Sequence, residues 1–335
     1  MKRPKNFLII RFSSIGDIVL TTPLLRCIKE QVHRSEIYYL TKKQFGLILE
    51  ASPYIDHIWL YEHNFKDLIP LIKSQNIHFI IDLHNNYRSN FVKKQFTLPN
   101  ATFPKLNIQK WVMVNLKLNF LPEIHIVDRY FEALAGMHVK NDGKGLDYFI
   151  PGKDEVSMDT LPSEFQKGYI AFAIGGKHNT KILPADKVAM ICNGLTKPVI
   201  LLGGHEDIER GEEITKACKT KVFDACGKYN INQSASLVRQ ADKVISNDTG
   251  LLHIAAAFKK PVISIWGSTI PAFGMTPYFP ESEQYLSQIF EVKKLSCRPC
   301  SKIGFEKCPK GHFRCMNDQN IEGIIKSLNA PLESR

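Results

Sequence analysis

Short apolar runs alternate with segments of helical spacing along most of the chain. Residues 7–10 form a continuous apolar run, as in a strand buried on both faces, and residues 18–31 carry apolar side chains at helical intervals. The same alternation predicts strands at 37–40, 57–61 and 79–83, and helices at 44–50, 65–74, 109–118 and 127–135. Strands that alternate with helices are typical of βαβ units, so a doubly wound α/β lobe is expected.

The alternation stops at residues 143–159 and then begins again. This stretch is polar, contains glycine and proline and has little periodicity, which indicates a connection between domains. The second pattern predicts strands at 169–174, 198–202, 243–246 and 261–266, and helices at 185–195, 208–218, 234–241, 250–258 and 321–328. We therefore expect two Rossmann-like domains, at 1–155 and 156–318, that face each other across a cleft. A C-terminal helix at 319–335 is a candidate to pack back on the first domain.

Composition and charge narrow the classes of function. Hydrophobic residues make up 44% of the 335 residues and charged residues 23%, which excludes wholesale disorder. The basic start at residues 1–5 is soon interrupted by Arg11 and Asp17, and no apolar stretch approaches the ~20 residues of a membrane span, so a cytoplasmic protein is expected. The net charge of +11 favours an anionic partner, which leaves nucleic acid, anionic lipid and phosphorylated substrates open.

The strongest motif follows the predicted strand at 243–246. Asn247 and Asp248 are capping residues, and Thr249 and Gly250 open an alanine-rich helix with His253 one turn later. The first amides of a helix point outward at its positive end, so they suit a phosphate or diphosphate. An ordinary capped helix with a core histidine would explain Asp248, but it explains the shared face of Thr249, Gly250 and His253 less well. We expect Asp248 to cap the helix and shape the loop.

A second candidate anion site follows the strand at 169–174. Gly175 and Gly176 precede a loop that contains Lys177 and Lys181, and glycines with cations at a strand end suit phosphate. A solvated basic loop is the alternative interpretation. The chain has neither a Walker A loop nor a GxGxxG motif, which weakens the case for a dinucleotide oxidoreductase.

Two loops of the first lobe carry candidate acceptor-side residues. Ser14, Gly16 and Asp17 follow the first strand, where a carboxylate can take a proton from a hydroxyl group. Asp17 as a simple helix cap is an equally good interpretation of the residues alone. Asn85 and Arg88 follow the strand at 79–83 and suit an anionic or hydroxyl-rich acceptor, although an ordinary polar loop is the alternative.

Four of the eight cysteines crowd near the C-terminus. They are Cys297, Cys300, Cys308 and Cys315. Four thiols at such spacing can bind zinc tetrahedrally, so they are a candidate structural zinc site, with reduced thiols or a redox crosslink as alternatives. No D-x-D sequence occurs in the chain, so the paired carboxylates that often hold Mg²⁺ against a sugar nucleotide are missing.

Two segments in combination resemble glycosyltransferase family 9, the bacterial lipopolysaccharide heptosyltransferases. Residues 7–23 resemble the N-terminus of that family, and residues 247–256 resemble its donor motif. Residues 181–184 look like its lysine-containing loop, and residues 82–89 like its acceptor segment. The lysine loop has Ile182 and Leu183 where the family commonly has an aromatic residue before the proline.

The resemblance implies the GT-B fold and an inverting transfer that requires no cofactor. It implies ADP-heptose as donor, a lipid A–Kdo type acceptor, and peripheral contact with the anionic inner membrane at its cytoplasmic face. Domain 1–155 would bind the acceptor and domain 156–318 the nucleotide sugar. By the same resemblance, Asp17 is the general base, and Lys181, Thr249, Gly250 and His253 contact the donor phosphates.

Two alternatives remain open at this point. One is a GT-B glycosyltransferase that uses another nucleotide sugar or glycan acceptor. The other is a basic nucleic-acid-binding protein, which the chain supports poorly because it lacks interleaved aromatic and basic runs. We therefore expect no nucleic-acid partner.

Overall fold

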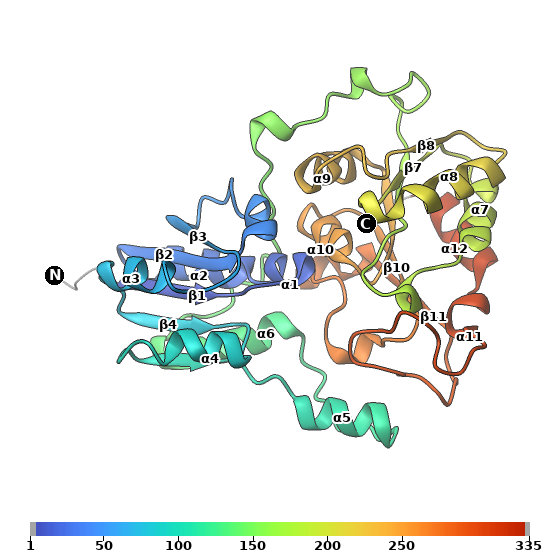
Figure 1. Cartoon of the computed structure of the whole chain (residues 1–335). Coiled ribbons are helices and arrows are strands. Elements are labelled where there is room, and N and C mark those ends of the chain that lie inside the picture. The colour runs from blue at the N-terminus through green and yellow to red at the C-terminus, as the bar shows by residue number, and fades with distance from the viewer. Residues whose placement is uncertain (1–4, 332–335) are drawn as a thin grey trace.

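The computed structural model describes residues 5–331, which form two α/β lobes joined by an extended connection (Figure 1). The first lobe contains a parallel sheet in the order β3-β2-β1-β4-β5. Its strands are β1 (Lys5–Ile10), β2 (Ser35–Lys42), β3 (His57–Tyr61), β4 (Phe79–Asp82) and β5 (Asn100–Thr102). The strand order reverses between β1 and β4, and ligands of such sheets bind beyond the carboxyl ends of the strands at this switch point.

The second lobe repeats this arrangement with one more strand. Its parallel sheet has the order β11-β10-β9-β6-β7-β8, with the switch point between β6 and β9. The strands are β6 (Ile170–Ala173), β7 (Val199–Leu202), β8 (Val222–Asp224), β9 (Lys243–Asn247), β10 (Val262–Trp266) and β11 (Ser287–Glu291). The prediction of two doubly wound lobes is thereby confirmed.

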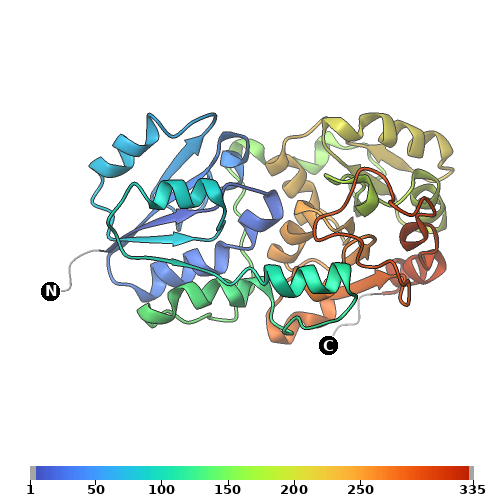
Figure 2. The ribbon, with the colours of Figure 1, turned by 60° about the horizontal axis from the view of Figure 1, so that its bottom comes forward.

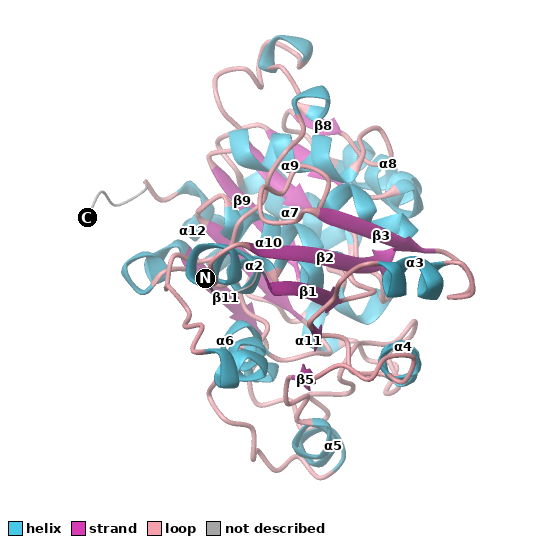
Figure 3. Cartoon of the chain, turned by 90° about the vertical axis from the view of Figure 1, so that its left-hand side faces the viewer, coloured by secondary structure: helices cyan, strands magenta, loops and turns pink. Residues whose placement is uncertain are grey.

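Helices lie on both sides of the strands (Figure 3). Those of the first lobe are α1 (Ile15–Val19), α2 (Thr22–Gln31), α3 (Leu68–Ser74), α4 (Tyr87–Lys93), α5 (Asn107–Asn115) and α6 (Ile126–Phe131). Those of the second lobe are α7 (Ala185–Gly194), α8 (Ile208–Ala217), α9 (Ile231–Gln240), α10 (Gly250–Ala257), α11 (Arg314–Asn317) and α12 (Ile321–Asn329). Central strands β1, β6 and β10 are almost wholly buried, as their largely apolar sequences predict.

Several elements differ from the sequence prediction. The single helix expected at 18–31 is divided into α1 and α2, because Pro23 starts a new helix and the hydroxyls of Thr21 and Thr22 donate to the last carbonyls of the first. The segment expected as a helix at 44–50 is a 3₁₀ helix, Lys43–Ile48. Helix α4 was missed, although Asn86 caps it by accepting from the amides of Arg88 and Ser89.

The two lobes touch where α1 meets α10 (Figure 1). A Cβ atom added to Gly16 would lie 2.5 Å from His253 Cδ2, and one added to Gly250 would lie 2.7 Å from Ile15 Cβ. The contact therefore depends on glycine on both sides. One hydrophobic cluster runs through it and includes Ile18 of the first lobe and Leu252 of the second.

The C-terminal helix lies on the second lobe. Buried Ile321, Ile324 and Leu328 of α12 join the core that includes residues of α7, and Gly194 faces Ile325. Packing of this helix on the first domain, the arrangement raised from the sequence, is not what the structure shows. Within residues 5–331, no helix is both long and apolar enough to cross a membrane.

Arg26 joins α2 to the connection between the lobes. It is 3% exposed, donates to both carboxylate oxygens of Asp142 at 2.8 Å and to Gly145 O at 2.9 Å, and pairs with Asp147. Because Arg26→Met leaves two carboxylates without their partner, we expect the free energy of unfolding to fall by about 3 kcal/mol in urea titrations. Lys43→Met, which removes an exposed pair with Glu62, is the control and should cost less than about 1 kcal/mol. Equal losses in the two variants would contradict this role of Arg26.

Candidate active site

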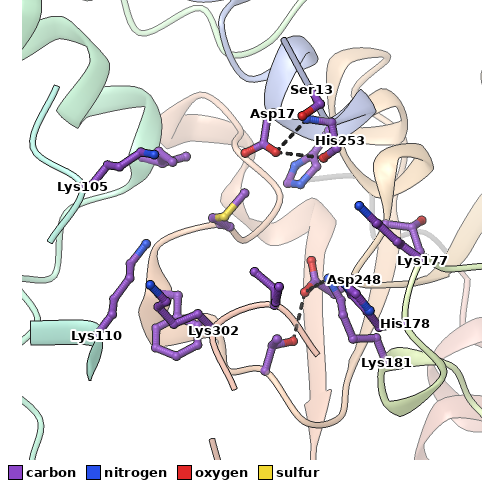
Figure 4. Close-up of a pocket in the computed structure, with 18 of the residues that line it drawn as sticks. Ser13, Asp17, Lys105, Lys110, Lys177, His178, Lys181, Asp248, His253 and Lys302 are labelled. Atoms are coloured by element: carbon purple, nitrogen blue, oxygen red, sulfur yellow. Dashed lines mark hydrogen bonds and ion pairs between the residues drawn. The ribbon is translucent and has the colours of Figure 1, made fainter. Parts of the chain in front are cut away.

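A cavity of about 430 Å³ opens between the lobes where β1 and β9 end; we call it the central cavity (Figure 4). Its titratable lining residues come from both lobes: Arg11, Asp17, His84, Lys105, Lys110, Lys177, His178, Lys181, Asp248, His253 and Lys302. Two carboxylates thus face six lysine or arginine side chains. Such a cavity suits a strongly anionic ligand.

Asp17 lies at the top of the central cavity in α1, directly after β1. One carboxylate oxygen pairs with Arg11 Nη2 at 2.6 Å, and the other accepts from Ser14 N at 3.0 Å and Ser14 Oγ at 2.8 Å. Burial alone would raise the pKa of this carboxyl, but Arg11 and the bonds from Ser14 outweigh it and hold the pKa below its ordinary value. Asp17 is therefore an ionised, fixed carboxylate at neutral pH.

The loop between β9 and α10 is shaped by Asn247. Its buried amide donates to Ile174 O at 3.1 Å and accepts from Leu183 N at 3.2 Å, which links this loop to the segments after β6. Asp248 does not cap α10 as expected, because Thr249 occupies the N-cap position. The Asp248 carboxylate instead pairs with Lys181 Nζ at 2.5 Å and accepts from Thr269 Oγ1 at 3.0 Å. Asp248 thus positions Lys181 beside the start of α10.

His253 is buried in α10 against Gly16. Burial lowers its pKa to about 4, so the imidazole is neutral at physiological pH. Its Nδ1 has no hydrogen-bond partner within the described part of the chain. A neutral imidazole has one N–H, so it can give a ligand one hydrogen bond but no charge.

The two glycines expected at the donor site line a second cavity. This flanking cavity, of about 590 Å³, lies along the ends of β6 and β7 and includes Gly175, Gly176, Gly203, Gly204 and Glu206. It shares Ser13, Ser14, Lys177 and Thr249 with the central cavity. One ligand can therefore extend through both.

The cations of the central cavity form two groups on opposite sides (Figure 4). Lys177, His178 and Lys181 lie on the second-lobe side, near Asp248. Lys105 and Lys110 approach from the first lobe, and Lys302 lies close to Lys110 on the same side. Burial lowers the pKa of Lys105 and lowers that of Lys110 to about 8, and neighbouring cations add to both shifts.

The three lysines of this second group were missed from the sequence. They belong to no motif, and Lys302 is far from the other two along the chain. A signal did exist, because residues 83–122 contain no aspartate or glutamate but six lysines or arginines. Such a run indicates an anion-facing surface, although it does not say which of its cations enter a cavity.

The structure separates the expected acceptor residues into two pairs. Ser14 and Gly16 line the central cavity beside Asp17. Asn85 and Arg88 line neither the central nor the flanking cavity. The backbone N–H of Asn85 donates to Asp82 Oδ1 at 2.7 Å, and the Arg88 guanidinium lies 5.1 Å from the centre of the Tyr87 ring. These two residues shape the start of α4 in the structure.

The zinc site expected from the cysteine spacing is not formed. Across residues 5–331, no three histidine, cysteine, aspartate or glutamate side chains are gathered so as to hold a metal ion. Cys297, Cys300, Cys308 and Cys315 are free thiols. Cys315 packs into the core of the second lobe, and Cys300 Sγ donates to Cys297 O at 3.1 Å. Burial raises the pKa of Cys315 to about 12, so this group is a thiol at neutral pH.

Two Rossmann-like lobes that face each other across one cavity form the GT-B fold. The solved family 9 glycosyl transferase of Veillonella parvula shares this fold, with a TM-score of 0.76 at 20% identity and 97% of each chain covered. E. coli ADP-heptose lps heptosyltransferase II shares it with a TM-score of 0.69 at 17% identity, covering 97% of this chain and all of that one.

The sequence comparisons give the family. The model of glycosyltransferase family 9 (heptosyltransferase) matches residues 66–303. Lipopolysaccharide heptosyltransferase 1 of Campylobacter coli is 26% identical over 285 residues, which is 78% of this chain and 83% of that protein. The chain belongs to glycosyltransferase family 9, as the resemblance of its first strand and its donor motif indicated.

The buried histidine predicts how stability depends on pH. The unfolded chain takes up a proton on His253 near its ordinary pKa of 6.5, whereas the folded chain does so only near 4. Stability from this group is therefore complete above about pH 7 and is lost as the pH falls toward 4; His84, with its pKa lowered by burial to about 4, acts in the same direction. In urea titrations between pH 6 and 5, His253→Gln should reduce the slope of unfolding free energy against pH by about 1.2 kcal/mol per pH unit. An unchanged slope would show that His253 is protonated as easily in the folded chain as in the unfolded one.

Proposed function

We propose that this enzyme transfers heptose from ADP-heptose to the inner core of lipopolysaccharide by a single, inverting displacement. The observation that carries the proposal is the position of the Asp17 carboxylate. It shares the central cavity with Thr249, His253 and Lys181 at the start of α10, in a chain of family 9. A nucleophile-activating group thus faces a site for a leaving diphosphate. The names of the E. coli and Campylobacter relatives support this donor and acceptor.

The donor extends through both cavities in this proposal. The flanking cavity takes the nucleoside, with the backbone of Gly175, Gly176 and Gly203 leaving room for it and Glu206 within the lining to accept from ribose hydroxyls. The diphosphate then lies at Thr249 and Lys177, which both cavities share. The sugar enters the central cavity below Asp17. This placement follows the general rule for ligands at a topological switch point.

The leaving diphosphate is stabilised by fixed positive charge. Lys181 is held beside the start of α10 by Asp248, and the first amides of Thr249 and Gly250 lie at the positive end of that helix. His253 contributes a hydrogen bond from a neutral ring. Groups that are already in place when charge develops are worth more than mobile ones, because they need no reorganisation. We propose that this set does the work that a divalent cation does in enzymes with a D-x-D motif.

Asp17 acts as the general base. The acceptor oxygen forms a bond to the anomeric carbon while the bond from that carbon to the diphosphate oxygen breaks, and the hydroxyl proton passes to Asp17. Arg11 and Ser14 keep the pKa of Asp17 low, so the carboxylate is a weak base toward a free hydroxyl. It takes the proton late, when the new bond has already made the hydroxyl acidic.

In this proposal the acceptor molecule carries an anionic group that binds to the first-lobe side of the cavity. Lys105, Lys110 and Lys302 line the cavity opposite the diphosphate site, and none of them forms an ion pair with a carboxylate among residues 5–331. Clustered ammonium groups, of which those of Lys105 and Lys110 belong to half-buried residues, repel one another, and a carboxylate or phosphate between them relieves that repulsion. The acidic sugar or phosphates of a lipid A–Kdo type acceptor would supply such a group. This places the enzyme in peripheral contact with the cytoplasmic face of the inner membrane, without a nucleic-acid partner.

The proposal is tested by separating donor binding from turnover. Asp17→Asn should bind ADP-heptose as the parent does and lose about a thousandfold in kcat, because the base is removed while the diphosphate site is intact. Binding is measured as the rise in unfolding temperature with ADP-, UDP- and GDP-sugars, of which only the ADP-sugar should stabilise the chain strongly. Near-normal turnover in Asp17→Asn would exclude this residue as the base. Stronger stabilisation by a UDP- or GDP-sugar would show that the donor carries that nucleotide instead of ADP.

The lysines on the proposed acceptor side allow a separate test of where the acceptor binds. Lys110→Met should raise the KM for an anionic acceptor about tenfold or more and leave the KM for ADP-heptose unchanged, since Lys110 lies on the acceptor side. With the parent enzyme, the acceptor KM should rise as the pH passes about 8, where unliganded Lys110 loses its proton. Lys187→Met, a change of an α7 lysine outside both cavities, is the control. A change in donor KM alone would contradict the assignment of the two sides.

A further inference from the structure

Exposed apolar side chains are concentrated in α5 and the loop that follows it. We call residues 107–124 the α5 segment. It carries six large, exposed hydrophobic side chains: Ile108, Trp111, Leu116, Leu118, Phe120 and Ile124. Ile108 is 77% exposed, Phe120 66% and Trp111 57%, and no residue of α5 is buried. Single exposed hydrophobic residues are ordinary on a protein surface, whereas a contiguous group marks an interaction surface.

The α5 segment is held in place although it contributes nothing to either core. Figures 1 and 2 show α5 apart from both sheets, at the edge of the first lobe and beside the loop before α11. The ammonium of Lys117 donates to Cys297 O at 3.1 Å and to Pro299 O at 2.7 Å. The Lys110 ammonium lies 5.8 Å from the centre of the Phe273 ring. Lysine side chains therefore hold the α5 segment against the second lobe while its six large hydrophobic side chains are exposed.

The charge around this surface selects its partner. The α5 segment itself carries Lys110, Lys117 and Glu123, and residues 83–106, which lead to it, carry four lysines or arginines and no carboxylate side chain in a chain of net charge +11. Two copies of a surface with net positive charge repel each other, whereas an anionic bilayer attracts it by about 1 kcal/mol for each cation that lies near the bilayer. Apolar and aromatic side chains beside lysines are also the composition of segments that lie in a membrane interface.

The α5 segment also adjoins the acceptor side of the central cavity. Asn107 and Lys110 of α5 line that cavity, as does Lys105 just before the helix. The exposed Ile108 and Trp111 are not among its lining residues. One helix therefore presents cations to the cavity and apolar side chains to the outside, so a surface bound by the apolar side would lie next to the acceptor entrance.

We propose that the α5 segment is a membrane-docking surface that inserts Ile108, Trp111 and Phe120 into the interface of an anionic bilayer. The inference rests on the proposed membrane-linked acceptor, which it deepens by naming the surface. Docking in this orientation brings the central cavity to the level of the lipid headgroups. A lipid-anchored acceptor then reaches Asp17 without leaving the membrane.

Tryptophan fluorescence gives a direct test, because Trp111 is the only exposed tryptophan of the three. Trp59 is 9% exposed and Trp266 1%. The full chain is mixed with phosphatidylcholine vesicles, with or without phosphatidylglycerol, in the absence of donor and acceptor. We expect at least tenfold tighter binding to the anionic vesicles, a blue shift of the emission, and quenching by brominated lipid chains.

Two variants make the test specific to this surface. The triple variant Ile108→Ser, Trp111→Ser, Phe120→Ser should bind anionic vesicles at least tenfold more weakly, with an unchanged unfolding temperature and unchanged turnover of a soluble, deacylated acceptor. The matched control Met190→Ser, Tyr285→Ser, Ile289→Ser removes exposed side chains from the second lobe and should bind as the parent does. Trp111→Ser alone serves if the triple variant does not fold.

Three outcomes would overturn the proposal. They are equal vesicle binding by parent and α5 variants, vesicle binding without a change in Trp111 emission, and a concentration-dependent dimer that the α5 changes abolish. The last would assign the surface to a second copy of the chain. Because no sugar transfer is measured in the vesicle assay, its failure leaves the proposed transferase activity untouched. Conversely, vesicle binding by an inactive enzyme would support the docking surface alone.

Discussion

The close approach of α1 and α10 holds the two sides of the site together. Gly16 meets His253 and Gly250 meets Ile15, so two helix starts from different lobes lie against each other with no room for a further carbon atom. Asp17 follows Gly16, and Thr249 precedes Gly250. The contact therefore sets the proposed base and the proposed diphosphate site at a fixed separation. Effective catalysis by positioned groups depends on this kind of rigid placement.

The charged side chains of the cavity lie around this contact in two groups, which match the two proposed substrates. Both carboxylates are paired with a cation, Asp17 with Arg11 and Asp248 with Lys181. The remaining lysines form one group near the start of α10 and one near α5. In the proposed mechanism each anionic substrate has cations of its own, and the sugar moves between them past Asp17. The +11 net charge, which by itself was compatible with nucleic acid or lipid, is partly explained by these two groups.

The sequence predicted the architecture well, because buried parallel strands leave continuous apolar runs and their connecting helices leave a different period. The sequence also placed Thr249, Gly250 and His253 near one another, because all three lie at the start of one predicted helix. It did not resolve the role of Asp248, since its pairing with Lys181 depends on Asn247 linking two loops that are more than sixty residues apart. Lys302 joins Lys105 and Lys110 only through the meeting of two lobes. The cysteine spacing predicted zinc, but spacing alone did not reveal that Cys315 faces the core of the second lobe.

The ion pair between Lys181 and Asp248 has a consequence for the end of the catalytic cycle. A diphosphate that draws Lys181 toward itself must compete with a carboxylate 2.5 Å from the same ammonium. Lys181 is therefore already paired with a carboxylate in the structure. In the proposed mechanism, this lysine changes counter-ion when the nucleotide binds and returns to Asp248 when the product diphosphate leaves, so that neither state has an unpaired buried lysine. Such an internal competitor would limit the affinity for the product and favour its release.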